Sequence, residues 1–425
     1  MFKHECKKIV LSISFIFFVI VIFLNFFTQM GDVLSERIEK PQPDWEDFGS
    51  VVREVPEVMM PQAISSLVDE YYRGYYVTYP IMTYKEKQLK AKENEKMEKI
   101  IEKLTGMSMA ELNELTNERN ENNQQQLNQL LARLEEENIP EEMALCDYVP
   151  ESYEPAANLS YEEFKDLMDQ ADDLLGGESS YSESNRLQKF SQVPMTYEEA
   201  LKDYELTFES GKLGLAYTRL MCDYTGIMIP LVGVFAVAFY WSQDKRRKVQ
   251  DVIYTRSISS LKLVVTRTGT LLALMAPIVL IPTIILYASV NPLYPETNIN
   301  WLAAFGETCL WLLPETLFTI AFGALVTELT SPYIAIVLQE AFWFFCLLNT
   351  KLVGDIKKID LVIRHNSLGD MGIFNLSYKT FVWNRVFYLI ISLVMLALLV
   401  LVYEGKRRGV LKDGFKNFEF GRKES

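Results

Sequence analysis

The stretch QDKRRKVQDVIYTRSISSLKLVVTR (Gln243–Arg267) is basic and lies between two long apolar runs. The run YTGIMIPLVGVFAVAFYW (224–241) precedes it, and TGTLLALMAPIVLIPTIILY (268–287) follows it. A helix needs about 20 apolar residues to cross a hydrocarbon core about 30 Å thick. Both runs therefore predict membrane spans, and the stretch between them predicts a loop at the membrane surface. Because Lys and Arg gather in cytoplasmic loops, its KRRK cluster places this loop inside the cell.

Other apolar runs along the chain predict further spans. The predicted spans are Ile9–Phe27, Tyr224–Ser242, Leu263–Ala288, Trp301–Leu325, Tyr333–Leu352 and Val386–Tyr403. The first follows Lys3, Lys7 and Lys8 and is interpreted as an uncleaved anchor, with a signal peptide as the alternative. An even number of spans puts both termini in the cytoplasm, in agreement with the basic ends KHECKK and GKRRGVLKDGFKNFEFGRKES. The predicted fold class is all-α: an integral, multi-pass protein of a bacterial cell membrane with six transmembrane helices and a mainly helical extracellular domain.

The predicted extracellular domain occupies residues 31–221, between the first two spans. Interleaved Glu and Lys predict a charged helical hairpin at about 84–138, with a break at Thr105-Gly106. Three capping-box signatures predict helix starts. They are Ser108-x-x-Glu111, Ser160-x-x-Glu163 and Thr196-x-x-Glu199.

The rest of the chain divides around this domain. Residues 1–30 form an N-terminal tail and the first span, and 222–404 hold the other spans. Within 222–404, an inner helix is predicted at about 245–260 and an outer interfacial segment at about 351–384, where positive charges accompany apolar residues and glycines. Residues 405–425 form a basic cytoplasmic tail.

Composition excludes several function classes. The net charge is −14, so a nucleic acid partner is not expected, because its phosphates would be repelled. With only two histidines, a histidine metal site or a Ser-His-Asp triad is not expected. The chain contains no GxxxxGK[ST], HExxH or GxSxG motif. We therefore expect no enzyme activity, no metal and no cofactor in this chain. Pairing of Cys146 with Cys222 outside the cell is left open by their spacing.

The basic stretch itself carries a short apolar stripe. Val249, Val252 and Ile253 are spaced i, i+3, i+4, and the polar TRSISS ends the helix before the next span. One interpretation is a plain basic loop that obeys the inside rule. The other is a helix at the inner membrane surface that docks into a soluble partner.

The order of these features resembles the membrane subunit of type-2 ABC exporters. Asp244 to Lys248, the helix to Tyr254 and the turn Thr255–Ser259 match that family's coupling helix, with Ser257 standing where proline is frequent. The pieces ALVTELTSPYIAIVLQ and NRVFYLIISLVMLALLVLVYEGKRRG resemble the junction of the fourth and fifth spans and the last span. The pieces LLGGESSYS and GLAYTRLMCDYTGI resemble permeases with a large outer insertion.

The resemblance implies a permease that forms a substrate pathway and couples to a separate ATPase subunit, which would bind ATP and Mg²⁺. It also implies a second permease copy or homologue as partner. The implied ATPase-coupling residues are Val249, Val252, Ile253, Tyr254, Thr255, Arg256, Ser257, Ile258 and Ser259. The alternative function is a membrane-anchored sensor or assembly scaffold that binds a partner through its acidic outer domain.

Three acidic residues in the predicted spans are candidates for the substrate path: Glu307, Glu315 and Glu340. A charge in the bilayer interior is costly, so such residues face protein or water. The first alternative is that they line a polar dimer interface or pathway. The second is that they are structural acids with satisfied partners.

Overall fold

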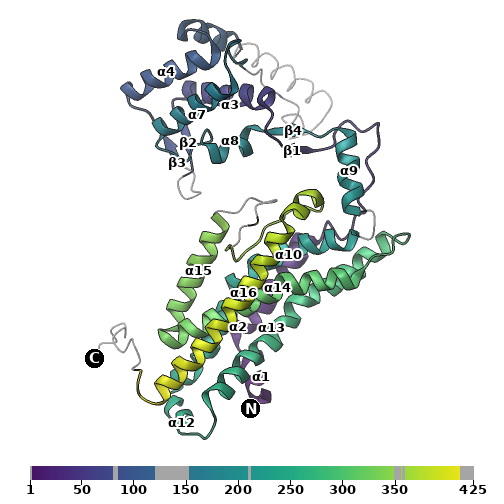
Figure 1. Ribbon diagram of the computed structural model, residues 1–425, viewed down its shortest axis with the longest axis vertical. Helices are drawn as coiled ribbons and strands as arrows, with labels where there is room; N and C mark the ends of the chain where they lie inside the picture. Colours follow the sequence, from purple (N-terminus) through teal and green to yellow (C-terminus); the bar gives the residue numbers. More distant parts are fainter. Residues whose placement is uncertain are drawn as a thin grey trace, which may run out of the picture. The chain divides into compact units, whose positions relative to one another are not determined.

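The computed structural model describes residues 2–79, 85–119, 153–208, 212–348, 356 and 359–411. The chain divides into two compact units, Met1–Gln42 with Glu198–Ser425, and Pro43–Tyr197. We call the first the membrane unit and the second the insertion unit. Both are built mainly from helices (Figure 1), as predicted for the fold class.

The membrane unit contains the long apolar helices. Its described elements are α1 (Phe2–Val10), α2 (Ile13–Met30), α9 (Tyr197–Phe208, which begins at the unit boundary), α10 (Leu213–Trp241), α11 (Gln243–Arg246), α12 (Gln250–Tyr254), α13 (Ser260–Val290), the 3-10 turn η2 (Asn291–Leu293), α14 (Trp301–Leu329), α15 (Pro332–Leu348) and α16 (Met371–Arg407). In the described part of the chain, α2, α10, α13 with η2, α14 and α16 are long and apolar enough to cross a membrane. These helices indicate a multi-pass membrane protein.

The predicted fifth span corresponds to α15, an apolar helix of 17 residues. The continuation of that prediction, to Leu352, lies outside the described residues. The predicted spans Leu263–Ala288, Trp301–Leu325 and Val386–Tyr403 fall within α13, α14 and α16, and Tyr224–Ser242 ends just beyond α10. The predicted span Ile9–Phe27 instead begins in α1 and crosses the break at Ser12, which caps α2. Both α10 and α16 begin well before Tyr224 and Val386. Charged residues such as Arg219 and Arg385 interrupt the apolar runs there. Both are buried and donate to backbone carbonyls, and Arg385 also pairs with Glu315. The part of the predicted interfacial segment 351–384 from Met371 onward is therefore the first turns of α16.

Helices α10 and α14 form the centre of the membrane unit. In their most apolar windows, 72% and 67% of residues are buried, against 22% in α16. Close packing of the two helices depends on small residues: a Cβ on Gly323 would lie 3.0 Å from Cγ1 of Val237. Side chains of α15 also bond to α10. Gln339 Nε2 donates to the carbonyl of Pro230 at 3.1 Å, and Trp343 Nε1 donates to that of Ile227 at 3.0 Å.

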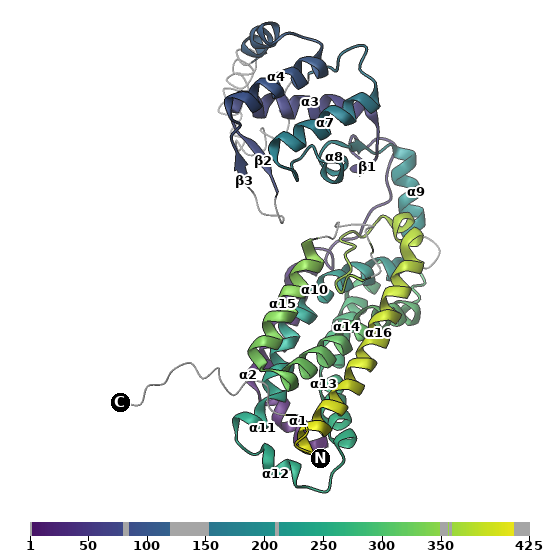
Figure 2. The ribbon, with the colours of Figure 1, turned by 60° about the vertical axis from the view of Figure 1, so that its left-hand side comes forward.

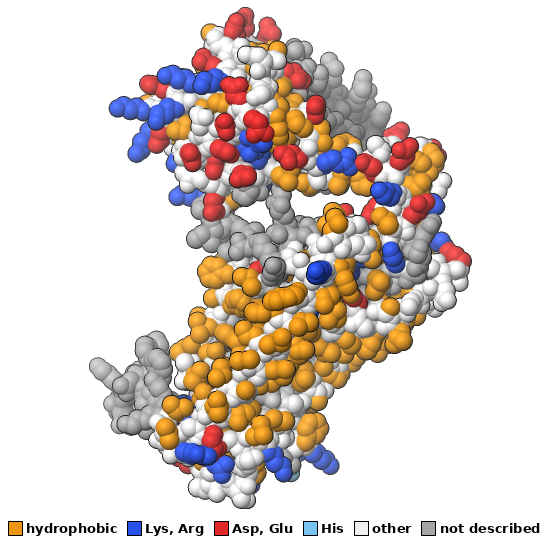
Figure 3. Space-filling view, viewed as in Figure 1, with side chains coloured by type: hydrophobic (Ala, Val, Ile, Leu, Met, Phe, Trp, Pro, Cys, Tyr) orange, Lys and Arg blue, Asp and Glu red, His pale blue; other side chains and the backbone are white. Residues whose placement is uncertain are grey.

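The outer helices carry a broad apolar surface. Figure 3 shows hydrophobic side chains covering one face of the membrane unit, with charged side chains gathered at one end. On α16, Leu376, Trp383 and Leu401 are more than half exposed. A surface of this kind on a long helix is suited to contact with lipid chains.

The insertion unit has its own core. Its described elements are β1 (Ser50–Val52), α3 (Pro56–Arg73), β2 (Tyr76–Thr78), β3 (Lys85–Lys87), α4 (Ala91–Thr105), α7 (Tyr161–Leu175), α8 (Glu183–Phe190) and β4 (Gln192–Pro194). Residues 109–119 are also helical. β1 pairs antiparallel with β4, and β2 with β3. Apolar side chains of α3, α4 and α7, such as Leu67, Ile101 and Phe164, are fully buried between the helices.

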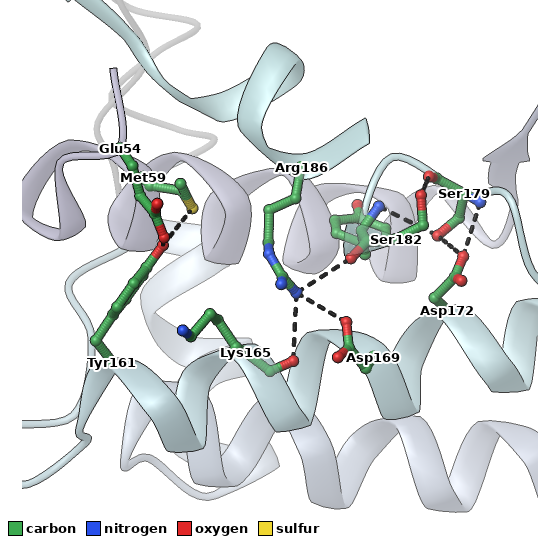
Figure 4. Close-up of polar contacts among 10 residues, drawn as sticks. Glu54, Met59, Tyr161, Lys165, Asp169, Asp172, Ser179, Ser182 and Arg186 are labelled. Atoms are coloured by element: carbon green, nitrogen blue, oxygen red, sulfur yellow. Dashed lines mark hydrogen bonds and ion pairs between the residues drawn. The ribbon is translucent and has the colours of Figure 1, made fainter. Parts of the chain in front are cut away.

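Polar contacts join α7 and α8 in this unit (Figure 4). Arg186 Nη1 donates to Asp169 Oδ1 at 3.0 Å and to the carbonyl of Lys165 at 3.2 Å. The hydroxyl of Ser179 donates to Asp172 Oδ1 at 2.6 Å. These contacts fix the turn after α7, where Gly176 adopts a left-handed φ of 91°.

Most of the predicted helix signals in this unit are confirmed. Ser108 N–H donates to Glu111 Oε2 at 2.9 Å, the reciprocal bond of a capping box. Ser160 caps α7, and Gly106 ends α4 in the left-handed conformation. One local prediction was wrong, because the start of the hairpin is the strand β3. The helix α3 lies in residues for which no element was predicted. Residues 120–138 of the hairpin lie outside the described residues.

The structure describes one of the two cysteines, Cys146 and Cys222, whose pairing the sequence left open. Cys222 is free and fully buried in α10, where it contributes to the core of the membrane unit. Cys146 lies outside the described residues.

Candidate coupling surface and buried ion pairs

The α10–α13 connection, residues 242–259, contains the predicted inner helix. Over the predicted range 245–260 it forms two short helices, α11 and α12, instead of one. Lys248 separates them with a left-handed φ of 56°, a conformation that is uncommon for a residue other than glycine. Ser259 ends the connection as the N-cap of α13 and accepts a hydrogen bond from the Lys262 N–H at 3.3 Å. The connection therefore consists of two short helices with a tight turn at Lys248 between them.

The predicted coupling residues divide into exposed and buried groups. Val249 and Val252 are 38% and 58% exposed. Ile253, Tyr254 and Ile258 instead pack against the core of the membrane unit. The other predicted residues, Thr255, Arg256, Ser257 and Ser259, are exposed. The stripe of Val249, Val252 and Ile253 is thus split, with the valines available to a partner and the isoleucine holding the connection to the bundle.

Arg407, in the last turn of α16, binds the backbone of the α10–α13 connection. Its guanidinium donates to three backbone carbonyls, those of Tyr254 at 3.1 Å, Arg256 at 2.8 Å and Ile258 at 2.7 Å. The ring of Tyr254 also packs edge-on against Tyr403 of α16, with centroids 5.4 Å apart. These contacts link α12 and the residues after it directly to α16.

A cleft of about 170 Å³ adjoins the connection and is lined by Gln250 and Ile253 of α12 among others. Ion pairs surround it: Asp244 of α11 pairs with Arg267 of α13, and Glu328 of α14 lies 3.3 Å from Lys406 of α16. Trp241 Nε1 donates to Glu328 Oε2 at 2.8 Å. These charges join the ends of α10, α13, α14 and α16 beside the connection.

A second group of charges lies inside the bundle, away from the connection. Glu315 of α14 and Arg385 of α16 are both fully buried, and their side chains lie 3.2 Å apart. Arg385 also donates to the carbonyls of Trp311 at 3.0 Å and Leu361 at 2.9 Å. Gly226 of α10 leaves room for the pair, since a Cβ there would lie 3.3 Å from Glu315 Oε2. The pair joins α14, α16 and the residues before α16.

The other two candidate acids have different surroundings. Glu307, also on α14, accepts a hydrogen bond from the Tyr378 hydroxyl at 3.3 Å. Glu340 is on α15, and its Oε1 has no hydrogen-bond partner in the described part of the chain. The structure therefore places Glu307 and Glu315 along one helix, with Glu340 on another.

The α15–α16 connection, described at 356 and 359–370, is held by charged side chains that the sequence did not single out. Asp223 of α10 accepts from Arg364 Nε at 2.7 Å and from the His365 N–H at 2.8 Å. Arg219, one helical turn earlier, donates to the carbonyls of Leu368 and Gly369, each at 3.2 Å. The only sequence signal for these two residues is a charge of each sign just before a predicted span.

His365 lies inside this connection. Its side chain is fully buried, Nε2 lies 3.3 Å from the Gly369 carbonyl, and the ring packs edge-on against Phe374. Burial lowers the pKa of His365 to about 4, and the positive charge of Arg219 acts in the same direction. The neutral imidazole is therefore the form that the folded protein holds at neutral pH, with Nε2 as donor.

This pKa predicts a loss of stability in weak acid. An unfolded histidine titrates near pH 6.5, so between about pH 6.5 and 4 the unfolded chain binds more protons than the folded chain. Stability is fully present above this window and falls as the pH drops through it, by about 2 kcal/mol at pH 5. Asp203 lies beside Asp370 with a pKa raised by burial, so its protonation acts in the opposite direction.

The measurement is thermal unfolding of the detergent-solubilised protein at pH 7.5 and 5. His365→Gln keeps a donor near Gly369 and should make the pH-dependent fall in stability smaller by that amount. The chain offers a matched control in its one other histidine, His4, which is exposed. A His4→Gln variant that changed the fall as much as His365→Gln does would refute this assignment.

Comparison with known proteins adds no relative to this description. Protein-family models, curated proteins and solved structures were searched, and none matched the chain. Within the described residues, no group of three or more His, Cys, Asp or Glu side chains is placed to hold a metal ion. The candidate site is therefore described by its geometry alone. It is an exposed turn with two exposed valines, attached to a helix bundle that carries ion pairs beside the turn.

Proposed function

We propose that this chain is the permease subunit of an ATP-binding cassette exporter. The observation that carries the proposal is the exposure of Val249 and Val252 on a short helix that Arg407 ties to the last long helix. Such a helix can receive force from a soluble ATPase and pass it to the membrane. The resemblance of its sequence to type-2 ABC exporters supports the same assignment.

The proposed topology has six membrane spans, with α15 as the fifth. The N-terminus, α12 and the end of α16 lie at one end of the membrane unit (Figures 1 and 2). That end carries Lys3, Lys7 and Lys8, the KRRK cluster and Lys406–Arg408. Because basic residues gather on the cytoplasmic side, this end is assigned to the cytoplasm. The insertion unit is then extracellular.

The proposed mechanism is alternating access in a dimer of two permease copies or homologues. ATP and Mg²⁺ bind the separate ATPase subunits, whose closure displaces α12. Arg407 and the ion pairs of Asp244 and Glu328 carry the displacement into α13, α14 and α16. A ligand shifts such an equilibrium only if it binds the two states differently, and the exposed valines are the proposed contact that differs between the states.

The candidate acids divide between two roles in this proposal. Glu315 holds the bundle together through Arg385 and is a positioning residue. Glu307 and Glu340 are the candidates for contact with substrate, because neither forms an ion pair with a described residue and each has a side-chain oxygen without a hydrogen-bond partner there. The single chain contributes one side of a pathway that a second permease would complete.

The test is capture of the solubilised protein from its native membrane after gentle cross-linking. We expect a protein with a GxxxxGK[ST] motif to be recovered in near-stoichiometric amount. A folded protein that recovers no ATPase would exclude the exporter and favour the alternative, a sensor or scaffold that binds through the insertion unit. Folding is checked by a single thermal transition in the same detergent.

A further inference from the structure

Two adjoining hollows lie where α1 and the start of α2 meet the end of α10 and α11. Lys8, Ser12 and Gln243 line both. The first, of about 370 Å³, continues onto the apolar side chains Ile13, Phe17, Phe235 and Phe239. The second, of about 330 Å³, is lined by His4, Lys7 and Arg247. Figure 2 shows α1 and α11 at this end of the membrane unit.

The cations of this site are of two kinds. Lys8 and Arg246 are already placed by their own chain. Lys8 lies 3.2 Å from Glu5 and 4.0 Å from Asp244, and Arg246, which lines the first hollow, donates to the Phe239 carbonyl at 2.7 Å. Lys7 and Arg247 are exposed, and neither has an ion-pair partner among the described residues. Two positive charges are therefore directed at a hollow that contains no anion of the protein's own.

Two apolar side chains of the site are exposed. Ile13 is 87% exposed and Phe17 49% exposed, on the first turns of a helix that is suited to cross a membrane. Ser12 caps that helix, and the partial positive charge of the helix start faces the same hollow. A cationic hollow at the end of an apolar groove matches the two parts of a charged lipid.

We propose that the two hollows bind an anionic phospholipid of the inner membrane leaflet. The phosphate of the headgroup lies between Lys7, Lys8 and Arg247, and an acyl chain lies along Phe17, Phe235 and Phe239. Basic pockets between helices at the cytoplasmic side are suited to such headgroups. The assignment to the inner leaflet rests on the orientation given under the proposed function. The proposal that the hollows bind an anionic phospholipid does not depend on that orientation. A free phosphate would leave Ile13 and Phe17 without a partner.

The experiment titrates the full-length protein in neutral detergent with phosphatidylglycerol and, separately, with phosphatidylcholine, and counts bound lipid by native mass spectrometry. We expect phosphatidylglycerol to bind at least tenfold more tightly. Each basic residue near a charged lipid surface contributes about 1 kcal/mol, so Lys7→Gln with Arg247→Gln should weaken binding about tenfold to thirtyfold. Equal binding of the two lipids by the unchanged protein would overturn the proposal.

A matched control removes the same charge from the same end of the membrane unit. Lys3 and Lys262 are exposed and line neither hollow, so Lys3→Gln with Lys262→Gln should leave phosphatidylglycerol binding within about twofold. An equal loss of phosphatidylglycerol binding in this control would show that general surface charge causes the effect, and it would overturn the proposed site. Phe17→Ala should weaken lipid binding and leave the weak binding of inorganic phosphate unchanged. Inorganic phosphate that displaced the lipid at micromolar concentration would assign the hollows to a soluble anion instead.

Discussion

Replacing Arg385 with methionine is expected to lower the free energy of unfolding by about 3–5 kcal/mol, because it leaves Glu315 buried without its partner. Replacing Glu315 alone with methionine should lower the free energy of unfolding by more than replacing Arg385 alone does. A buried carboxyl can become neutral by taking up a proton, whereas a guanidinium keeps its charge. Arg385 would then retain only the carbonyls of Trp311 and Leu361. The measurement is the unfolding of each variant in detergent, followed by circular dichroism.

The double variant separates a paired interaction from a simple loss of packing. Methionine at both positions removes both charges, and we expect it to recover at least half of the larger single loss. Losses that simply added in the double variant would show that the two side chains act independently. Glu315→Gln tests its role in transport separately. A folded Glu315→Gln variant with unchanged transport would remove Glu315 from the pathway.

The second large effect is expected at the exposed valines. Val249→Asp with Val252→Asp places two carboxylates in the proposed contact, and burying an unpaired charge costs several kcal/mol. Recovery of the ATPase should fall at least a hundredfold. Because both valines are exposed, the free energy of unfolding should change by less than about 0.5 kcal/mol, as for other exposed positions.

The control places the same new side chain nearby. Val410, beyond the end of α16, is 76% exposed and lines no part of the described cleft. Val410→Asp should leave ATPase recovery unchanged. Ile253 is unsuitable for this comparison, since it packs against the core of the membrane unit. Equal recovery of the ATPase with the valine variant and with the unchanged protein would show that the contact lies elsewhere on the chain.

Local signals predicted much of the fold. Long apolar runs located the helices of the membrane unit, and Ser108 and Ser160 correctly marked helix starts, because a cap depends on residues three positions apart. The helix α3 was missed because its sequence begins at Pro56, contains Pro61 and follows a proline-rich lead-in. Proline is compatible with a first turn, so composition alone was misleading there.

Partners distant in sequence could not be predicted. Arg407 was assigned to a basic end by its position, and nothing local indicates that its guanidinium meets the carbonyls of residues near 256. Likewise, Asp223 was included in no predicted span, although it holds the connection before α16. The valine stripe was predicted, but the side that faces outward depends on the turn at Lys248, which no motif specifies.

The central claim is that the α10–α13 connection contacts an ATPase. The most direct measurement places a photo-activated cross-linking amino acid at position 252 in the native membrane, with position 410 as the reference. We expect an adduct between the chain and a protein with a GxxxxGK[ST] motif at 252, lost when Val249→Asp is added and absent at 410. An expressed, membrane-inserted protein that forms no such adduct at 252, or forms it equally at 410, would contradict the account.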